Sequence, residues 1–260
     1  MGEKWTINAL ADLVGLEKDE RALAVTSLSG KGPSLALGTR NGIVKRVNPE
    51  LLGKDSWEII GLKDGDEVVG ALELDDDDLE LCFVTQGAAL LHFPASAVRP
   101  QGRSGGGVAG IKAKDPAIFF GAAPRHGSSV VTVAASSPAV AGKEPGSVKV
   151  TPFNQYPPKG RATGGMRCQR FLKGETALVL AWVGPDPAVA CAASGVPTEL
   201  PAPNMRRDGS GDLGHQPILA VGSRRHGSDK DDSVSGESDN VVDSAFFSDG
   251  EIDAQPDLFS

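Results

Sequence analysis

The sequence VRPQGRSGGGVAGIKA, residues 98–113, links the end of one predicted strand to the start of the next through a basic, glycine-rich turn. Glycine reaches positive φ at little steric cost, so a turn of this composition lets the backbone approach another surface closely. A related sequence, PKGRATGGMRCQR, occupies residues 158–170 and has the same Gly-Arg-x-x-Gly-Gly core. Because the pattern recurs, we interpret the chain as a repeat protein built around these turns.

Short strands and tight turns surround these two sequences. Residues 35–47 predict a hairpin, because an Asn-Gly pair between two stretches of alternating apolar residues is a strong signal for a two-residue turn. The arrangement returns in residues 79–93, and Thr39 and Thr85 are 46 residues apart. A period of this length, with four strands in each unit, is typical of propeller blades.

The remaining strands are expected at residues 67–74, 129–133, 147–150, 168–171, 177–183, 188–191, 198–200 and 217–221. The composition agrees with short strands and many turns, because the chain contains 33 glycines and 18 prolines. We predict an all-β, propeller-like domain of about four blades over residues 23–226. Residues 1–22 are expected to be a lead-in or the remnant of a preceding blade, and residues 227–260 a disordered acidic tail. The abrupt start at Met1 favours a fragment of a longer protein.

The formal net charge of -8 is distributed very unevenly along the chain. Residues 1–98 have a net charge of -8 and residues 227–260 a net charge of -9. Residues 99–173, by contrast, carry 12 basic and only two acidic side chains. The acidic average therefore hides a basic middle, which predicts an anionic partner for that part of the chain.

The sequence offers no pattern for a metal site, a disulfide framework or a cofactor. Cys82, Cys168 and Cys191 form no CxxC pair, and the four histidines lack the spacing of metal ligands. No apolar run approaches the roughly 18 residues of a membrane-spanning helix, and the N-terminus lacks a signal pattern. We expect a soluble cytoplasmic protein with no membrane contact and no cofactor.

Three phrases carry a resemblance to a known family: residues 37–46 (LGTRNGIVKR), 62–69 (LKDGDEVV) and 93–112 (FPASAVRPQGRSGGGVAGIK). On these residues the chain resembles the C-terminal domain of bacterial type IIA topoisomerase A subunits, the family of DNA gyrase A and topoisomerase IV A. The likeness covers about residues 23–223. The combination of the three phrases is a specific signal for this family.

The resemblance implies a β-pinwheel, a propeller-like ring in which neighbouring blades exchange a strand and double-stranded DNA wraps around a basic rim. It implies non-sequence-specific DNA binding as part of an ATP-dependent type II topoisomerase that controls DNA topology, and hence a nucleoid-associated location. The partners that it implies, besides DNA, are the breakage-reunion domain and the ATPase B subunit.

The predicted DNA-contacting residues come from the basic middle of the chain and from the first blade. Contacts from such side chains go to phosphates, so they position DNA without reading its sequence. The predicted set consists of Arg40, Lys45, Arg46, Arg99, Gln101, Arg103, Lys112, Lys159, Arg161, Arg167, Arg170 and Lys173.

Two departures from the family's pattern narrow this interpretation. Gyrase A subunits of the family carry a box, Gln-(Arg/Lys)-Arg-Gly-Gly-(Lys/Arg)-Gly, and residues 101–107 keep Gln101, Arg103, Gly105 and Gly107 but lose both flanking basic positions. This favours a topoisomerase IV-like or divergent subunit. The family's catalytic tyrosine follows an arginine, whereas Tyr156 follows Gln155, so we interpret Tyr156 as a packing or loop residue. With no phosphate-binding loop either, the chain is expected not to be an enzyme on its own.

Two other classes of function stay open at this point. A propeller scaffold that binds a protein partner would use an apolar or acidic face and bind DNA weakly. An enzyme is not supported by any nucleophile and base pair. The acidic tail either provides solubility or competes with DNA for the rim, and the run Asp75–Asp78 is expected on a loop away from the DNA path.

Overall fold

The computed structural model describes residues 15–17, 20–26, 32–48, 50, 52–54, 56–74, 78–192 and 194–223. The expected acidic tail, most of the expected N-terminal lead-in and Asp75–Asp77 lie outside the described residues.

The first blade shows how the sheets are assembled. Its strands are β1 (Ser34–Thr39), β2 (Ile43–Val47), β3 (Val68–Leu74) and β6 (Val108–Ala109), in the order β3-β1-β2-β6. The outermost strand, β6, follows the hairpin of the second blade in sequence and pairs antiparallel with β2 of the first. The first blade is therefore completed by a strand from its neighbour.

Two further sheets repeat this exchange. The second blade has the order β10-β5-β4-β7, formed by β4 (Glu80–Thr85), β5 (Ala89–Pro94), β7 (Ala117–Ala123) and β10 (Met166–Arg167). The third has the order β11-β8-β9-β14, formed by β8 (Ser128–Ala135), β9 (Ser147–Pro152), β11 (Ala177–Pro185) and β14 (Asp212–Leu213). The fourth has three strands, β12 (Ala188–Ala192), β13 (Pro197–Thr198) and β15 (Ile218–Ser223).

Short 3-10 turns are the helical elements of the described residues: η1 (Ala95–Ala97), η2 (Pro138–Val140) and η3 (Phe153–Gln155). The all-β class and the four propeller-like blades are confirmed. The prediction of a strand at residues 168–171 was wrong, because the exchanged strand is Met166–Arg167 and the backbone then leaves the sheet edge. The carbonyl of Cys168 instead accepts a hydrogen bond from Lys149 at 2.9 Å.

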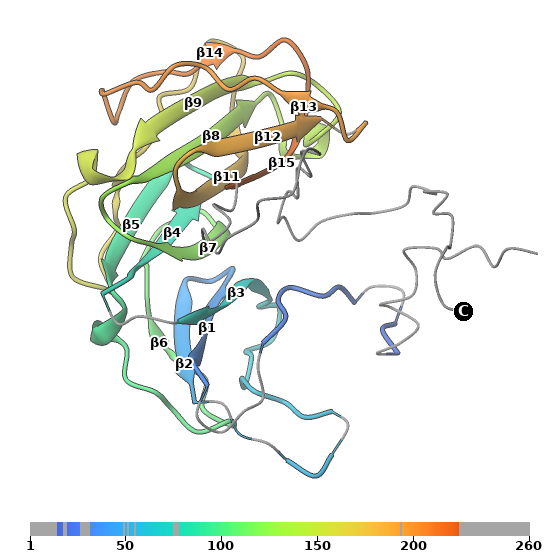
Figure 1. Cartoon of the computed structure of the whole chain (residues 1–260), viewed down its shortest axis with the longest axis vertical. Coiled ribbons are helices and arrows are strands. Elements are labelled where there is room, and N and C mark those ends of the chain that lie inside the picture. The colour runs from blue at the N-terminus through green and yellow to red at the C-terminus, as the bar shows by residue number, and fades with distance from the viewer. Residues whose placement is uncertain are drawn as a thin grey trace, which may run out of the picture.

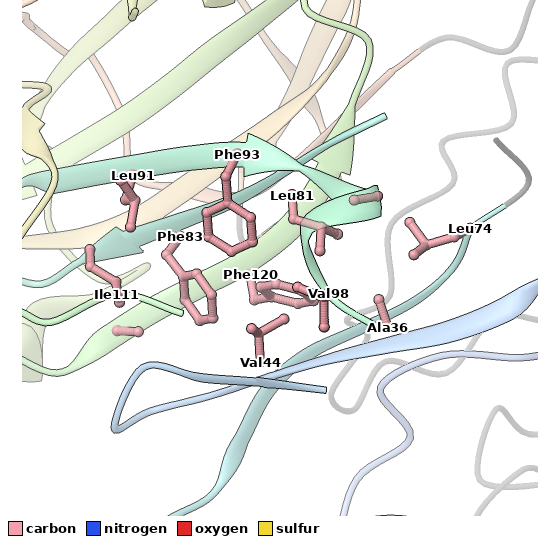
Figure 2. Packing of buried hydrophobic residues seen from close by; sticks show 12 residues of the cluster. Ala36, Val44, Leu74, Leu81, Phe83, Leu91, Phe93, Val98, Ile111 and Phe120 are labelled. Carbon is pink, nitrogen blue, oxygen red and sulfur yellow. The ribbon is translucent and has the colours of Figure 1, made fainter. Parts of the chain in front are cut away.

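The hydrophobic core lies between the blades rather than within one sheet. Successive side chains of a strand point to opposite faces, so each strand contributes to two interfaces. In β4, Leu81 and Phe83 pack toward the first blade, and Cys82 and Val84 toward the third. Figure 2 shows the first of these interfaces, where Phe83 and Phe120 lie with ring centroids 4.8 Å apart.

The blades follow one another in an arc (Figure 1). Strands β3, β7, β11 and β15 contact one another in succession, so they line the inner side of the arc. Strands β6, β10 and β14 form the opposite, outer edges of their sheets. The segments that lead into these three strands therefore lie on the outer rim.

Gly107, directly before β6, has a backbone geometry that another residue cannot adopt easily. Its φ is +80°, and a Cβ atom at this position would lie 2.7 Å from the carbonyl oxygen of Val44. Gly165 repeats the arrangement before β10, with φ +73° and a Cβ position 2.6 Å from the carbonyl oxygen of Leu90. The exchange of strands β6 and β10 thus depends on a glycine directly before each of them.

We predict that Gly107→Ala lowers the free energy of unfolding by at least about 1–2 kcal/mol, because the left-handed conformation and the contact with Val44 both oppose a Cβ atom. Gly102→Ala is the matched control, since nothing lies within 4 Å of the added Cβ in the same turn. Thermal unfolding followed by circular dichroism should show a loss of about 2–4 °C per kcal/mol for Gly107→Ala. Equal melting temperatures for the two variants would contradict the role given to Gly107.

Candidate nucleic-acid interface

Three related turns lie on the outer rim: turn 1 (residues 101–107), turn 2 (residues 159–165) and turn 3 (residues 204–211). Each leads into an exchanged strand, β6, β10 or β14. Each also begins with the same interblade hydrogen bond, in which its first backbone N–H donates to the second strand of the preceding blade. The three bonds are Gln101 N to Arg46 O (2.8 Å), Lys159 N to His92 O (3.2 Å) and Asn204 N to Val150 O (2.7 Å).

Backbone contacts also connect the turns to one another. The N–H of Lys112, just after turn 1 and β6, donates to the carbonyl of Thr163 in turn 2 at 2.9 Å. The N–H of Arg170, just after turn 2 and β10, donates to the carbonyl of Gly209 in turn 3 at 2.9 Å. Residues 101–112, residues 159–170 and turn 3 therefore lie next to one another in succession. We call these residues the continuous path, and it crosses three blades.

Most of the predicted DNA-contacting side chains are exposed. Exposed residues are Arg40, Arg99, Lys112, Lys159, Arg161, Arg167, Arg170 and Lys173, and Gln101 and Arg103 are partly exposed. The continuous path holds all of these except Arg40, Arg99 and Lys173. Arg40 lies apart from it at the β1–β2 hairpin, where it forms an exposed ion pair with Glu67 at 3.0 Å.

Several of these side chains also support the turns. The Oε1 atom of Gln101 accepts a hydrogen bond from the N–H of Gly107 at 3.0 Å and so closes turn 1. Arg161 donates from Nη1 to the carbonyl of Ala109 at 3.2 Å, which ties turn 2 to β6. The Nε atom of Arg103 forms an ion pair with Glu50 at 3.1 Å. The Arg103–Glu50 pair is exposed, and exposed ion pairs contribute little energy.

Lys45 and Arg46 are not on the rim surface, which corrects the expectation that they line it with the other basic residues. Lys45 has no exposed area, and Arg46 is 9% exposed. Arg46 donates from Nε and Nη2 to the hydroxyl of Ser34 and from Nη1 to the carbonyl of Ala95 in η1. Their position in β2 turns both side chains toward neighbouring segments rather than toward solvent.

The Nζ atom of Lys45 donates to three backbone carbonyls. They belong to Ile59 (2.6 Å), Arg103 (2.5 Å) and Gly105 (2.6 Å), and the last two lie in turn 1. An ammonium has three N–H donors, so each finds an acceptor. Burial lowers the pKa of Lys45, and the nearby Glu58 partly opposes this effect.

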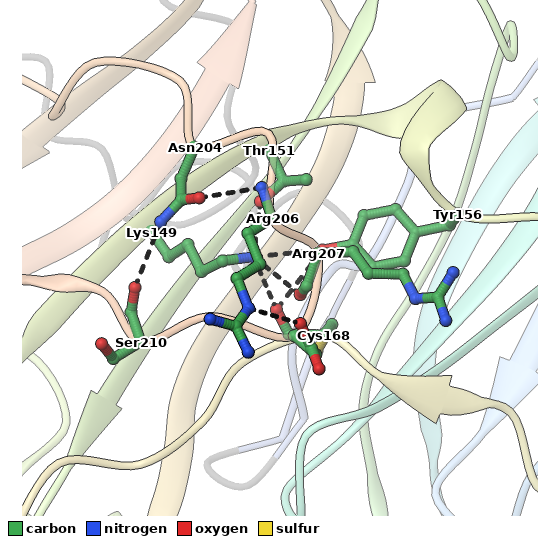
Figure 3. Close-up of polar contacts among 9 residues, drawn as sticks. Lys149, Thr151, Tyr156, Cys168, Asn204, Arg206, Arg207 and Ser210 are labelled. Atoms are coloured by element: carbon green, nitrogen blue, oxygen red, sulfur yellow. Dashed lines mark hydrogen bonds and ion pairs between the residues drawn. The ribbon is translucent and has the colours of Figure 1, made fainter.

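Lys149 in β9 repeats this arrangement for turn 3 (Figure 3). Its Nζ atom donates to the carbonyl of Cys168 at 2.9 Å, the carbonyl of Arg207 at 2.8 Å and the hydroxyl of Thr151 at 2.6 Å. Burial lowers the pKa of Lys149 to about 8, while the nearby Asp208 carboxylate favours the charged form. Lys149 was missed as a site residue, although the sequences IVKRV and SVKV place both lysines inside apolar strands.

The second blade has a different interblade contact. Leu91 occupies the position of the buried lysine, and the next residue, His92, is fully buried. The ring of His92 lies 3.0 Å from Glu80 Oε2 through Nδ1 and 2.8 Å from the carbonyl oxygen of Tyr156 through Nε2. Because a carbonyl only accepts, Nε2 carries a proton and Nδ1 faces the carboxyl group of Glu80.

Tyr156 is fully buried, which confirms its prediction as a packing residue. Its hydroxyl lies 3.3 Å from the carbonyl oxygen of Cys168, and burial raises its pKa well above the usual range. Burial likewise raises the pKa of the Cys168 thiol to about 12, so the thiol is neutral near pH 7.

Two residues of turn 3 were absent from the predicted set, although the sequence showed a basic turn there. Arg206 and Arg207 are exposed and extend the basic path onto the third blade. Arg206 forms an ion pair with Asp208 at 3.1 Å, and this contact lowers the pKa of Asp208. In the part of the chain that the structure describes, no cluster of side chains could hold a metal ion and no helix could cross a membrane.

The comparison with known proteins agrees with this geometry. The family "DNA gyrase C-terminal domain, beta-propeller" matches residues 58–75, 79–122 and 146–177, which include turn 1, turn 2 and Lys149. Over these residues the chain is similar to the DNA gyrase C-terminal domain family. Turn 3 and its two arginines lie beyond the matched residues of this family.

Two curated relatives are DNA gyrase A subunits. That of Staphylococcus aureus strain MRSA252 is 26% identical over 208 residues, which are 77% of this chain and 23% of the relative. That of Chlamydia muridarum is 30% identical over 112 residues, which are 41% of this chain and 13% of the relative. The chain thus spans less than a quarter of either relative.

Two solved structures share the fold. The C-terminal domain of DNA topoisomerase IV matches with a TM-score of 0.66 and 20% identity, over 82% of this chain and 68% of that domain. The C-terminal domain of DNA gyrase A matches with a TM-score of 0.60 and 17% identity, over 82% of this chain and 73% of that domain. At this identity the likeness supports the β-pinwheel fold alone.

The burial of Lys149 predicts a pH dependence of stability. The pKa is about 8 in the folded chain against 10.5 for an ordinary lysine, so between these values the unfolded chain binds more protons. The free energy of unfolding therefore rises with pH across this window, by up to about 3 kcal/mol from this group. Denaturant unfolding of the wild type and Lys149→Met, measured between pH 7 and 10.5, isolates the contribution as a difference. If the difference in free energy of unfolding between the two proteins did not change between pH 7 and 10.5, folding would not lower the pKa of Lys149.

Proposed function

We propose that the outer rim binds double-stranded DNA without sequence specificity and wraps it around the arc of blades. The observation that supports this most is the continuous path of three basic turns, which are joined by backbone hydrogen bonds from Lys112 and Arg170. Backbone contacts fix the spacing of the turns, while the exposed guanidinium and ammonium groups remain available for phosphates. DNA that follows the path is guided by phosphate contacts, which carry no sequence information.

The charge on the rim is large enough to favour bent DNA. The continuous path carries eight exposed or partly exposed cations: Arg103, Lys112, Lys159, Arg161, Arg167, Arg170, Arg206 and Arg207. Bending 20–30 base pairs costs on the order of 1–6 kcal/mol, which a single contact cannot offset but a row of contacts can. About eight phosphate contacts would give a slope of about -7 in a plot of log K against log salt concentration. Strong binding at low salt and steep loss at higher salt follow from this proposal.

We further propose that the chain acts within the A subunit of a type II topoisomerase, as its gyrase A relatives suggest. Its partners would then be the breakage-reunion domain and the ATPase subunit, and it would control DNA topology by presenting wrapped DNA to them. The chain itself would supply binding and geometry rather than cleavage, in a nucleoid-associated, cytoplasmic setting.

We predict that replacing Arg103 and Arg161 together with alanine weakens binding to several unrelated 40-base-pair duplexes to the same degree. The salt slope should fall by about 2, because each lost phosphate contact removes about 0.9. Fluorescence anisotropy titrations at several salt concentrations measure both quantities. The matched control is Lys63→Ala with Lys143→Ala, which removes the same charge from exposed positions outside the three turns.

The control pair should retain binding within about twofold at the same ionic strength, since exposed charges off the path are screened. An equal loss in the control pair would indicate that only net charge matters. A loss confined to particular DNA sequences would contradict phosphate recognition by the turns.

A further inference from the structure

Lys45 and Lys149 occupy the same place in their blades. Each lies in the second strand of its hairpin and is at most 2% exposed. Each Nζ atom binds one carbonyl from the segment leading to the inner strand of its own blade, Ile59 for Lys45 and Cys168 for Lys149. Each also binds the carbonyl of an arginine in the following turn.

The two arginine carbonyls belong to Arg103 in turn 1 and Arg207 in turn 3. A carbonyl that is held from inside the blade fixes the backbone on which its own side chain stands. The side chain of Arg103 is 41% exposed, and Arg207 is exposed. The buried ammonium and the exposed guanidinium thus act on opposite sides of the same peptide segment.

We propose that Lys45 and Lys149 are positioning residues that hold turn 1 and turn 3 so that Arg103 and Arg207 face the DNA. The inference rests on the proposed DNA-binding function and assigns to two buried residues a part in it. The lysines contact no DNA, because their own surfaces are covered. Their effect on affinity passes through the turn backbone.

The second blade provides the contrast within the same molecule. Leu91 occupies the lysine position there, so turn 2 lacks a buried ammonium behind it. Turn 2 is instead held by surface side chains, with Arg161 bound to the carbonyl of Ala109 and Lys159 bound to the carbonyl of Gly165. Positioning by a buried lysine is therefore specific to turns 1 and 3.

A double-mutant cycle separates positioning from general stabilisation. The variants are Lys45→Met, Arg103→Ala and the two combined, with affinity for a 40-base-pair duplex and the salt slope as readouts, at a temperature where circular dichroism shows each protein folded. Lys45→Met should weaken binding threefold to tenfold and lower the salt slope by about 1, as Arg103→Ala does. The combined variant should bind within twofold of Arg103→Ala, because both changes remove the same contact.

The control cycle pairs Lys149→Met with Arg103→Ala, whose effects should multiply because they act on different turns. If Lys45→Met does not fold, Lys149→Met paired with Arg207→Ala provides the same test on turn 3. Full affinity in Lys45→Met, or multiplied losses in the Lys45 and Arg103 cycle, would overturn the positioning role while leaving the DNA proposal intact. No effect of Arg103→Ala itself would overturn both.

Discussion

A backbone hydrogen bond between neighbouring blades determines what the outer rim can do. The first N–H of each turn donates to the second strand of the preceding blade, as Gln101 does to Arg46. From that point the chain follows the blade's open edge and completes its sheet as the exchanged strand. The bond therefore sets three things at once: the pairing of the exchanged strand, the orientation of neighbouring blades and the place of each basic turn on the rim.

Two different kinds of charge serve this arrangement. Buried cations such as Lys45 are surrounded by carbonyl oxygens, which satisfy all three donors without a carboxylate partner. Exposed cations such as Arg167 face the solvent, where phosphates can bind them. Removing a buried donor leaves carbonyls unpaired, so the buried class controls backbone geometry and the exposed class controls attraction. A rim that bends DNA needs both, because attraction without fixed spacing cannot offset the bending energy.

The sequence was sufficient for the all-β class and the blade hairpins because hairpin turns and strand alternation are local signals, whereas the strand exchange was implied only by the family resemblance. It also identified turns 1 and 2, whose Gly-Arg-x-x-Gly-Gly cores are visible in the letters. Lys45 and Arg46 were placed on the surface because a charged residue in a strand is normally exposed, and a carbonyl cage assembled from distant segments leaves no local trace. Turn 3 escaped the predicted set because its sequence, NMRRDGSG, lacks the Gly-Arg-x-x-Gly-Gly core, and its spacing to the exchanged strand differs by one residue.

The change in linking number tests the wrapping claim most directly, because it separates wrapping from simple attachment. Nicked circular plasmid would be closed by ligase at low salt with increasing amounts of the chain, and the topoisomers resolved on a gel after the protein is removed. The account predicts a linking-number shift that grows with protein concentration in one direction. Binding without any shift, by a chain that is folded under the same conditions, would contradict a rim that wraps DNA.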